Sequence, residues 1–529
     1  SMESLLETVS DAQTLFSYYN QKGNEARDMG QYRIAEQWYL HGKKLVEGDG
    51  SNQSSANRHL CYTNLRSLYA ALGQYDNALL YANKAIAEYQ AHMPKDDVKY
   101  NFPYIAVADI YRMKGDKDNC YRCLERLHEC MAQVTEPKEL LHIYVTRGRC
   151  HFHFKDYEAA LNDYRKADER LAAKYPQTDG YRIALLALIG GTENRLKHYA
   201  DSMQHYSMYA ECTKGLYGEN SMEHVNAKIY LANAEGFAGH TDEGCRDYAE
   251  AEVQLKALMK QRIPYMSSVE REGLWSPLSS LFTMMTPYAL KAGQHQTAFT
   301  KSCYDALVMT KSFLLESERS VYDIIKRKGT AEDMHDYALL TAMKNQVKTW
   351  EKDYEANADS ILSVSKKVSH LEHLLTERCK GYSDGTKFMD VDYETVRQAL
   401  GQEDVLVDFT DYVQDDKGRK YAAYIITHAQ DYPLLLPLFA ESQIDALGID
   451  RPDMYYDTGH APDVLQLLWA PLKDNIAEGA TVYYVPSQLL FELALESLPL
   501  ADGSLLGKHY KFVRLSSARE LVKMKAKRE

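Results

Sequence analysis

The hydrophobic pattern of the first 310 residues is built from a repeated block. In each block a Gly or Lys is followed by a small residue five places on and, nine places on, by an aromatic or small residue, or by Leu124 in the looser block at Gly115. A tyrosine often stands at the second place. The blocks begin at Gly30, Gly73, Gly115, Lys155, Lys197 and Gly239, at intervals of 40 to 43 residues. A seventh block, Gly293 with Ala298, follows after 54 residues. A fixed period of this length indicates a repeat architecture.

Each block predicts a pair of antiparallel helices. The Gly lets the chain turn between them, and the small residue lets the helices approach closely. The aromatic is expected to fill the groove made with the next pair, because no single pair buries its apolar face alone. The sequence therefore predicts a mainly α fold with a helical solenoid over residues 12–310. The excess of tyrosine, 41 of 58 aromatic residues, is explained by this packing rather than by a ligand.

Residues 311–381 are expected to form long helices that connect the solenoid to the rest of the chain. Thr330 and Asp333 have the spacing of a capping box. Apolar residues then recur at three- and four-residue steps to Leu375, which predicts paired helices with one buried stripe. A helix lying on a membrane is disfavoured because the polar face is acidic.

The pattern changes to short apolar runs over residues 386–529, which predicts an α/β domain. The predicted strands are 405–409, 421–426, 482–485 and 511–515, and the predicted helices are 392–400, 464–476 and 489–498. The first two strands flank an Asp/Gly turn that ends at Gly418, so they are expected to form a hairpin. Strands alternating with helices favour a largely parallel sheet covered on both faces.

The charge and cysteine content narrow the function classes. Sixty-two basic against 75 acidic residues give a net charge of −13, which argues against a nucleic-acid or anionic-membrane binder. No run is long and apolar enough for a membrane span. Nine cysteines without dense spacing are typical of reduced thiols, and we expect a cytoplasmic protein.

Three groups of residues resemble chemical sites but are better explained by packing. Cys120, Cys123, His128 and Cys130 have a metal-like spacing, yet they fall on the second helix of a block. The group from Cys150 through His151 to His153 lies likewise on a first helix. His428 follows a strand, but no cysteine comes after Cys379 that it could activate, so a surface loop is expected. We therefore predict no catalytic, cofactor-binding or metal-binding residue. The basic tail, residues 523–528, is expected to be a solvated linker or a cut between two halves of a domain.

Two families match these patterns. The blocks resemble tetratricopeptide repeats, with a period longer than the usual length of about 34 residues. The segment Val482-Tyr-Tyr-Val-Pro486, its continuation through Leu489–Leu500, and Tyr510-Lys-Phe-Val-Arg-Leu-Ser-Ser-Ala-Arg-Glu520-Leu resemble the first half of the CHAT domain, a caspase-like, separase-related peptidase domain. The chain departs from that family at Ser487-Gln488, where Asp-Gly is usual, and at Ala494, where Pro is usual.

The second resemblance implies a non-catalytic role for residues 386–529. In the family the catalytic His and Cys lie on later strands, so these residues correspond to the N-terminal, pseudo-protease half. This implies the regulatory part of a bacterial caspase-like cysteine endopeptidase, used in regulated proteolysis such as phage defence or cell death. Its expected partners are the C-terminal catalytic half, which would complete an unfinished sheet edge, and a protein activator, inhibitor or substrate on the solenoid. The alternative is a non-enzymatic adaptor that binds proteins only.

Overall fold

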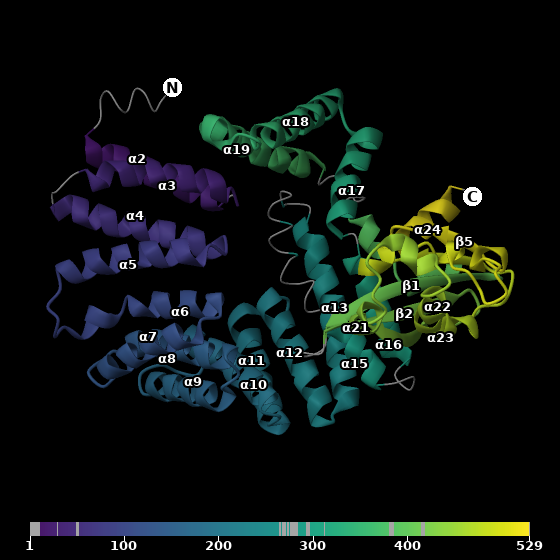
Figure 1. Cartoon of the computed structure of the whole chain (residues 1–529), viewed down its shortest axis with the longest axis horizontal. Coiled ribbons are helices and arrows are strands. Elements are labelled where there is room, and N and C mark those ends of the chain that lie inside the picture. The colour runs from purple at the N-terminus through teal and green to yellow at the C-terminus, as the bar shows by residue number, and fades with distance from the viewer. Residues whose placement is uncertain are drawn as a thin grey trace. The chain divides into compact units, whose positions relative to one another are not determined.

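The computed structural model describes residues 11–527 apart from residues 29, 49–51, 264–265, 267–270, 272–274, 276–283, 293–296, 312, 380–385 and 414–417 (Figure 1). The chain forms two compact units, each assembled from two segments of sequence. The first unit combines Ser1–Cys212 with His335–Glu372, and the second combines Thr213–Met334 with His373–Glu529.

Helical hairpins make up most of the first unit, which confirms the predicted solenoid. In the described part of this unit the pairs are α2 (Ala12–Asp28) with α3 (Tyr32–Glu47), α4 (Asn52–Ala71) with α5 (Tyr75–Ala91), α6 (Tyr104–Lys114) with α7 (Lys117–Met131), α8 (Pro137–His153) with α9 (Tyr157–Ala172), and α10 (Gly180–Arg195) with α11 (Tyr199–Tyr217). Consecutive pairs pack on one another, so each covers an apolar face that its neighbour leaves open.

The turn inside each hairpin has the same backbone conformation. The residue that opens each block has a positive φ, which is 73° at Gly30, 71° at Gly73, 78° at Gly115, 65° at Lys155, 63° at Lys197 and 93° at Gly239. The following N–H donates to the carbonyl five residues back, as Gln74 does to Tyr69 at 2.9 Å. These are Schellman turns, which end a helix with one left-handed residue. The turn assigned to the glycines is confirmed, and two lysines adopt it as well.

Replacing Lys197 with Gly is expected to raise the free energy of unfolding by about 1 kcal/mol, since a side chain in the left-handed region costs about 1–2 kcal/mol. Urea denaturation followed by circular dichroism measures it. The matched control is Gly73→Ala, where an added Cβ would meet no atom within 4 Å, so that any loss comes from the backbone alone. A loss of stability in Lys197→Gly would show that the lysine side chain outweighs the backbone strain.

Tyrosine rings in the second helices lie on glycines in the first helices of the same hairpins. The pairs are Gly23 with Tyr39, Gly148 with Tyr164, and Gly190 with Tyr206. A Cβ added at Gly148 would lie 2.4 Å from Cε1 of Tyr164, which is itself 1% exposed. Tyr164 also shares a core with Leu185 and Ile189 of the next hairpin, as predicted for the groove between hairpins. The close contact lies inside the hairpin, because only a residue without a Cβ leaves room for the ring.

Two long helices return to the first unit after the solenoid. They are α18 (Ala331–Trp350) and α19 (Tyr354–Cys379). The predicted capping box starts α18: the Thr330 N–H donates to Oδ2 of Asp333 at 2.8 Å, and the Asp333 N–H donates to Oγ1 of Thr330 at 3.1 Å. Ile361 and Leu362 of α19 are buried in the core of the first hairpins. The apolar stripe of α19 is thus covered by protein.

The second unit continues the hairpins and then adds a sheet. Its described helices include α12 (Met222–Ala238), α13 (Thr241–Arg262), α15 (Met285–Ala292), α16 (Thr297–Thr310), α17 (Phe313–Lys328), α20 (Tyr393–Ala399), α21 (Glu441–Asp445), α22 (Ala461–Leu468), α23 (Ala470–Lys473) and α24 (Ala518–Ala526). Helices α15 and α16 stand where the seventh block was predicted. Ala298 lies in α16, whereas Gly293 lies outside the described residues.

Five strands form one mixed sheet in the part of this unit that the structure describes. They are β1 (Asp404–Val413), β2 (Arg419–Thr427), β3 (Leu434–Ala440), β4 (Thr481–Val485) and β5 (Lys511–Arg514), in the order β3-β2-β1-β4-β5. The predicted hairpin of β1 and β2 is confirmed, and β4 and β5 are parallel to β1. The expectation of a largely parallel sheet is wrong, because β3 extends the antiparallel side. The sequence did not predict β3 because the strand contains Pro437, and within sheets proline is largely confined to edge strands.

Helices from distant parts of the chain cover the two faces of the sheet. Val405, Val407 and Phe409 of β1 pack with α22 and α23 on one face. Leu406 of β1 and Tyr424 of β2 pack on the other face with α13, α16, α20 and α24. Alternate residues of one strand therefore enter different cores, as the two-residue period of a strand requires. The last repeat hairpin is itself one of the layers that cover the sheet.

Two of the predicted helices are wrong in the second unit. Residues 489–498 form two short 3-10 turns, Gln488–Glu492 and Leu495–Ser497, with extended backbone at Leu493 between them. The leucines of this segment pack in the sheet core although the backbone between them is irregular. Their spacing along the sequence resembles the apolar stripe of a helix, which explains the wrong prediction. The predicted helix 464–476 is split into α22 and α23 next to Pro471, because proline lacks the N–H that a continuous helix needs.

Candidate functional site

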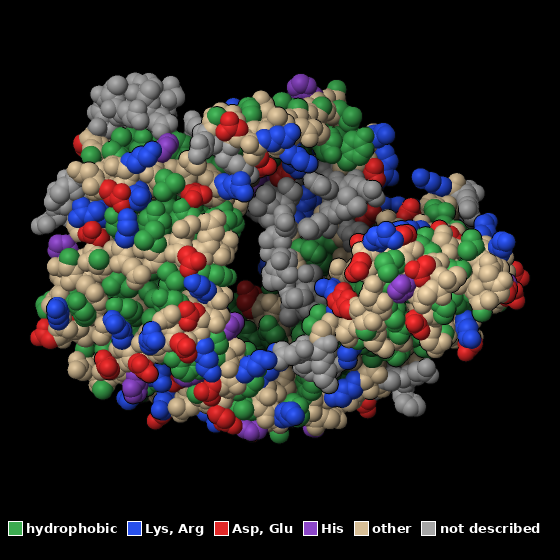
Figure 2. Space-filling view, in the orientation of Figure 1, with side chains coloured by type: hydrophobic (Ala, Val, Ile, Leu, Met, Phe, Trp, Pro, Cys, Tyr) green, Lys and Arg blue, Asp and Glu red, His purple; other side chains and the backbone are tan. Residues whose placement is uncertain are grey.

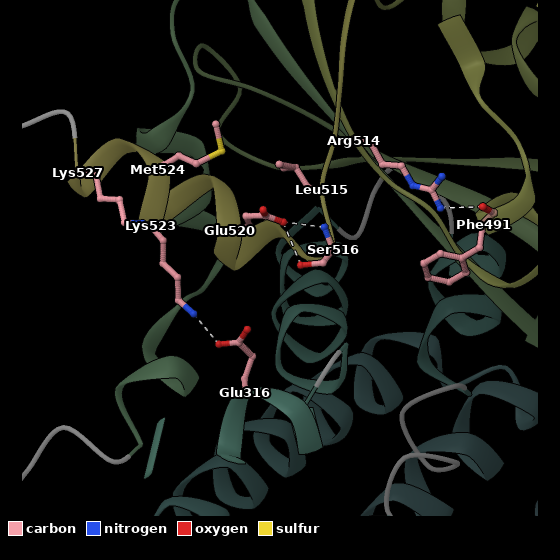
Figure 3. Close-up of a pocket in the computed structure, with 9 residues that line it drawn as sticks. All are labelled: Glu316, Phe491, Arg514, Leu515, Ser516, Glu520, Lys523, Met524 and Lys527. Atoms are coloured by element: carbon pink, nitrogen blue, oxygen red, sulfur yellow. Dashed lines mark hydrogen bonds and ion pairs between the residues drawn. The ribbon is translucent and has the colours of Figure 1, made fainter. Parts of the chain in front are cut away.

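A pocket of about 670 Å³ opens at the carboxyl end of β5, beside α24 (Figure 3). Its lining residues are Glu316, Phe491, Arg514, Leu515, Ser516, Glu520, Lys523, Met524 and Lys527. In open α/β sheets, ligands bind beyond the carboxyl ends of the strands, and functional pockets commonly have volumes of this order. We therefore take this cavity, called here the β5 pocket, as the candidate functional site.

The strand next to the pocket, β5, pairs with β4 on one side and with no described strand on the other. The N–H groups of Lys511 and Leu515 donate to carbonyls in and beside β4, at 3.0 and 2.8 Å. Alternate residues face the neighbour in a parallel ladder, so the backbone groups of Phe512 and Arg514 point away from β4. Among the described residues no strand pairs with that side. The pocket thus adjoins a row of backbone donors and acceptors that can pair with another chain.

One wall of the pocket combines an exposed ring with a cation. Phe491 is 54% exposed, although it is large and apolar. The Nη2 of Arg514 donates to the carbonyl of Phe491 at 2.7 Å, and the guanidinium carbon lies 5.8 Å from the ring centroid. This wall offers an apolar surface and a positive charge side by side (Figure 3).

The opposite wall is formed by α24. Oε2 of Glu520 accepts hydrogen bonds from the N–H and the Oγ of Ser516, at 2.8 and 3.0 Å, which fixes the turn into the helix. Nζ of Lys523 pairs at 2.7 Å with Oε2 of Glu316, a residue only 4% exposed. Residues 523–526 continue α24, so the prediction of a linker is wrong for them, although Lys523, Lys525 and Ala526 are exposed to solvent as predicted. Arg528 lies outside the described residues.

A buried arginine fastens α24 to the last repeat hairpin. Arg519 is 1% exposed and donates to three backbone carbonyls, those of Phe388 at 3.0 Å, Lys311 at 2.6 Å and Met309 at 2.9 Å. Two of these carbonyls are at the C-terminal end of α16, where the helix dipole favours a cation. Burial lowers the pKa of Arg519 to about 10, so the side chain stays charged at neutral pH.

A second buried contact joins α16 to the sheet. Asp408 of β1 is fully buried, and its Oδ1 lies 2.6 Å from Nζ of Lys311. The hydroxyl of Tyr304 donates to Oδ2 of the same carboxylate at 3.3 Å. A buried carboxylate requires such partners, because desolvation otherwise disfavours its charge. The repeat hairpin and the sheet are therefore held together by ionic as well as apolar contacts.

The structure places His428 away from the β5 pocket lining. Nδ1 of His428 lies 3.1 Å from the carbonyl of Leu400, and the carbonyl of His428 accepts a hydrogen bond from Arg397 at 3.0 Å. These contacts fasten the end of β2 to α20. No described cysteine lies in residues 386–527.

The metal-like cysteine group lies in the core of the first unit. Cys120, Cys123 and Cys130 are buried among apolar residues, and the Sγ of Cys120 donates to the carbonyl of Ala108 at 3.4 Å. The pKa of the Cys123 thiol rises to about 11 because it is buried. Within the described residues, no three His, Cys, Asp or Glu side chains are placed to hold a metal ion.

The second His/Cys group also takes part in packing. Cys150 is fully buried against the same carbonyl of Ala108, at 3.9 Å. Nδ1 of His151 lies 3.0 Å from the hydroxyl of Tyr121, and burial lowers the pKa of this histidine. His153 lies edge-on to the ring of Phe154. None of these side chains is among the residues that line the β5 pocket.

The sequence patterns placed Arg514 and Leu515 on a strand and Lys523 in a basic tail, but they did not indicate that these residues form one site with Glu316 and Phe491. Phe491 was assigned to a helix, and nothing in its neighbourhood marks it as exposed. Asp408 could have been suspected of a buried polar contact, because it is a lone carboxylate inside an apolar strand. Arg519 and Lys523 stand four residues apart and so share one face of a helix, which is a signal that the linker interpretation overlooked.

Comparisons with known proteins support the repeat part of this description. The tetratricopeptide repeat model matches residues 141–170, which lie in α8 and α9. No curated protein sequence matches the chain. Similar solved structures include aspartyl phosphate phosphatase F from Bacillus subtilis, with 12% identity over 71% of this chain and 96% of that one and a TM-score of 0.37. BtubC from P. vanneervenii has 14% identity over 47% and 92% of the two chains, with a TM-score of 0.36.

A third similar structure contains kinesin light chain TPR-like repeats from Podosopora anserina. It has 13% identity over 40% of this chain and 99% of that one, with a TM-score of 0.34. Likenesses of this size support no inference about binding or activity. The chain thus contains a tetratricopeptide repeat within a mostly helical, repeat-like solenoid and carries a small C-terminal sheet.

Proposed function

We propose that this chain is the regulatory and partner-sensing part of a caspase-like cysteine endopeptidase acting in the bacterial cytoplasm. Repeat solenoids present extended surfaces to other proteins, so protein partners follow from the fold. The finer proposal draws on the resemblance of residues 482–521 to the CHAT domain. In this proposal residues 386–529 serve as the non-catalytic half, and regulated proteolysis in phage defence or cell death is the expected setting.

The observation that carries the proposal is the core shared by the last repeat hairpin and the sheet. Lys311 and Tyr304 from the hairpin bind Asp408 of β1, and Arg519 binds carbonyls at the end of α16. Packed elements of this kind move as rigid bodies, so a displacement of α16 reaches the sheet directly. An activator, inhibitor or substrate bound by the solenoid would thereby alter the surface on which the catalytic half docks.

Surface charge is consistent with protein partners. Figure 2 shows Lys and Arg side chains interspersed with Asp and Glu over the visible face, without one broad basic area. The net charge of −13 disfavours nucleic acid as the general partner. Among the helices that the structure describes, none has the length and apolarity needed to cross a membrane.

The chain by itself is expected to show no peptidase activity, because a cysteine peptidase needs a thiolate with an imidazole within reach. His428, the histidine that follows a strand, is bound to a backbone carbonyl instead. The measurement is labelling with a thiol-reactive, caspase-type probe together with turnover of fluorogenic peptides, with an active caspase as the positive control. Labelling at a single cysteine accompanied by turnover would contradict the proposal.

The adaptor hypothesis is the second candidate, and one observation favours it: the family model that matches residues 141–170 is a tetratricopeptide repeat, a unit of solenoids that bind proteins. The coding sequence downstream of Glu529 separates the two candidates. Strand-like runs that carry a His and a Cys would support the peptidase. If those runs are expressed with the chain, peptide turnover should depend on the solenoid. A downstream sequence without such runs would favour the adaptor hypothesis over the peptidase.

A further inference from the structure

We propose that the free edge of β5 and the β5 pocket bind an extended acidic segment of a partner protein by strand addition. The inference rests on the proposed role of the sheet as a docking platform for a second polypeptide. It adds the chemistry of the segment and the residues that recognise it.

The backbone of β5 supplies the main-chain part of this interaction. The N–H and C=O groups of Phe512 and Arg514 face away from β4, as shown above. An extended segment laid along this edge would form hydrogen bonds with them, which is how strand addition gains affinity. Specificity then comes from the side chains that flank the edge.

Those flanking side chains favour an acidic segment. Lys511 and Arg514 are exposed on β5, and Lys527 lies on the pocket wall formed at the end of α24. Among the described residues no carboxylate pairs with any of these three cations, whereas the pocket carboxylates Glu316 and Glu520 already have partners. Acidic side chains would therefore be attracted. A second copy of this chain, which brings the same cations on its own β5, would be repelled.

The pocket also accepts an apolar side chain from the segment. Phe491 is 54% exposed, and Met524 contributes a half-buried apolar side chain to the same lining. Along an extended segment alternate side chains point the same way. The best-fitting segment thus combines acidic residues, near the cations on the two faces of β5, with apolar residues that enter the pocket.

The test uses the full chain and a fluorescein-labelled peptide of alternating Glu and Val, seven residues long and blocked at both ends. The matched control peptide replaces every Glu with Lys. We expect the acidic peptide to bind at least about tenfold more tightly in fluorescence anisotropy, with affinity falling as salt is raised. Hydrogen exchange should slow at the amides of Phe512 and Arg514 when the acidic peptide is present.

Two substitutions at one position separate charge from strand pairing. Arg514→Gln removes the cation but keeps the outward N–H, and it should weaken binding while leaving the protection pattern intact at saturation. Arg514→Pro also removes the N–H, which an edge strand tolerates, and it should abolish protection at Phe512. Lys473→Gln on α23, an exposed lysine outside the pocket lining, is the control and should change nothing. Thermal melts check that each variant is folded.

Several outcomes would overturn the inference. Equal binding of the two peptides would remove the acidic specificity, and unchanged binding by Arg514→Pro would remove the strand addition. Protection that rises with protein concentration in the absence of peptide would identify a second copy as the occupant. The peptidase proposal is tested separately: peptide binding without any peptidase partner would leave an acidic-segment adaptor, whereas a solenoid-dependent peptidase with no peptide binding would refute this inference alone.

Discussion

Replacing Arg519 with Met is expected to lower the free energy of unfolding by about 3–5 kcal/mol, because three buried carbonyls would lose a charged donor. The side chain is 1% exposed and bonds to Phe388, Lys311 and Met309. Met has a similar length and supplies no N–H group, so the three buried carbonyls that Arg519 binds would lose this hydrogen-bond donor. Urea denaturation with far-ultraviolet circular dichroism measures the loss.

Two further variants make the Arg519 experiment specific. Arg519→Lys keeps the charge but cannot span three acceptors with a rigid fork, so an intermediate loss is expected. Lys473→Met on the surface of α23 removes a charge of the same sign and should have little effect. A loss below about 1 kcal/mol in Arg519→Met would show that α24 is not fastened to α16 through this residue.

Alanine at Tyr164 is expected to cost about 3–5 kcal/mol, because the change removes a fully buried ring from the first unit. The ring lies on Gly148 of the same hairpin and is 1% exposed. Alanine at Tyr206, which lies on Gly190 in the next hairpin, should cost a similar amount. The same denaturation experiment measures both, and a loss below about 1 kcal/mol would place the rings in solvent.

A double-mutant cycle tests the contact between Tyr164 and Gly148 itself. Gly148→Ala alone should be strongly destabilising, since the new Cβ would lie 2.4 Å from the ring. In the Tyr164→Ala background the same methyl group enters vacated space, so Gly148→Ala should cost much less there. Additive losses would contradict the packing, because residues that touch are expected to show coupling.

Local patterns of the sequence predicted the hairpins and most of the strands. The period of 40 to 43 residues located the turns, and all six predicted turn positions have positive φ. The signal is local because a left-handed turn depends on one residue and a helix on its own apolar stripe. The strand β3 and the 3-10 turns at residues 488–497 were missed, since their backbone follows from the surface that they cover.

The candidate site was not predictable in the same way. Its walls come from Glu316, Phe491 and α24, which are separated by up to about two hundred residues of sequence. The spacing of Arg519 and Lys523 showed that they share a helix face, but it could not show that α16 and α17 lie under that face. Charge at a position also says little about burial, as the fully buried Asp408 illustrates.

The sequence by itself determined the repeat, its turns and the presence of an α/β segment, because each depends on residues within about forty positions of one another. Only the tertiary structure decided that the last repeat hairpin covers the sheet, that Asp408 and Arg519 join the two, and that a cationic pocket lies beside the β5 edge that no described strand covers. These features depend on which surfaces meet after the local elements have formed. Many surfaces of similar apolarity could pair, and the choice among them is made by shape and by the few buried charges that must find partners.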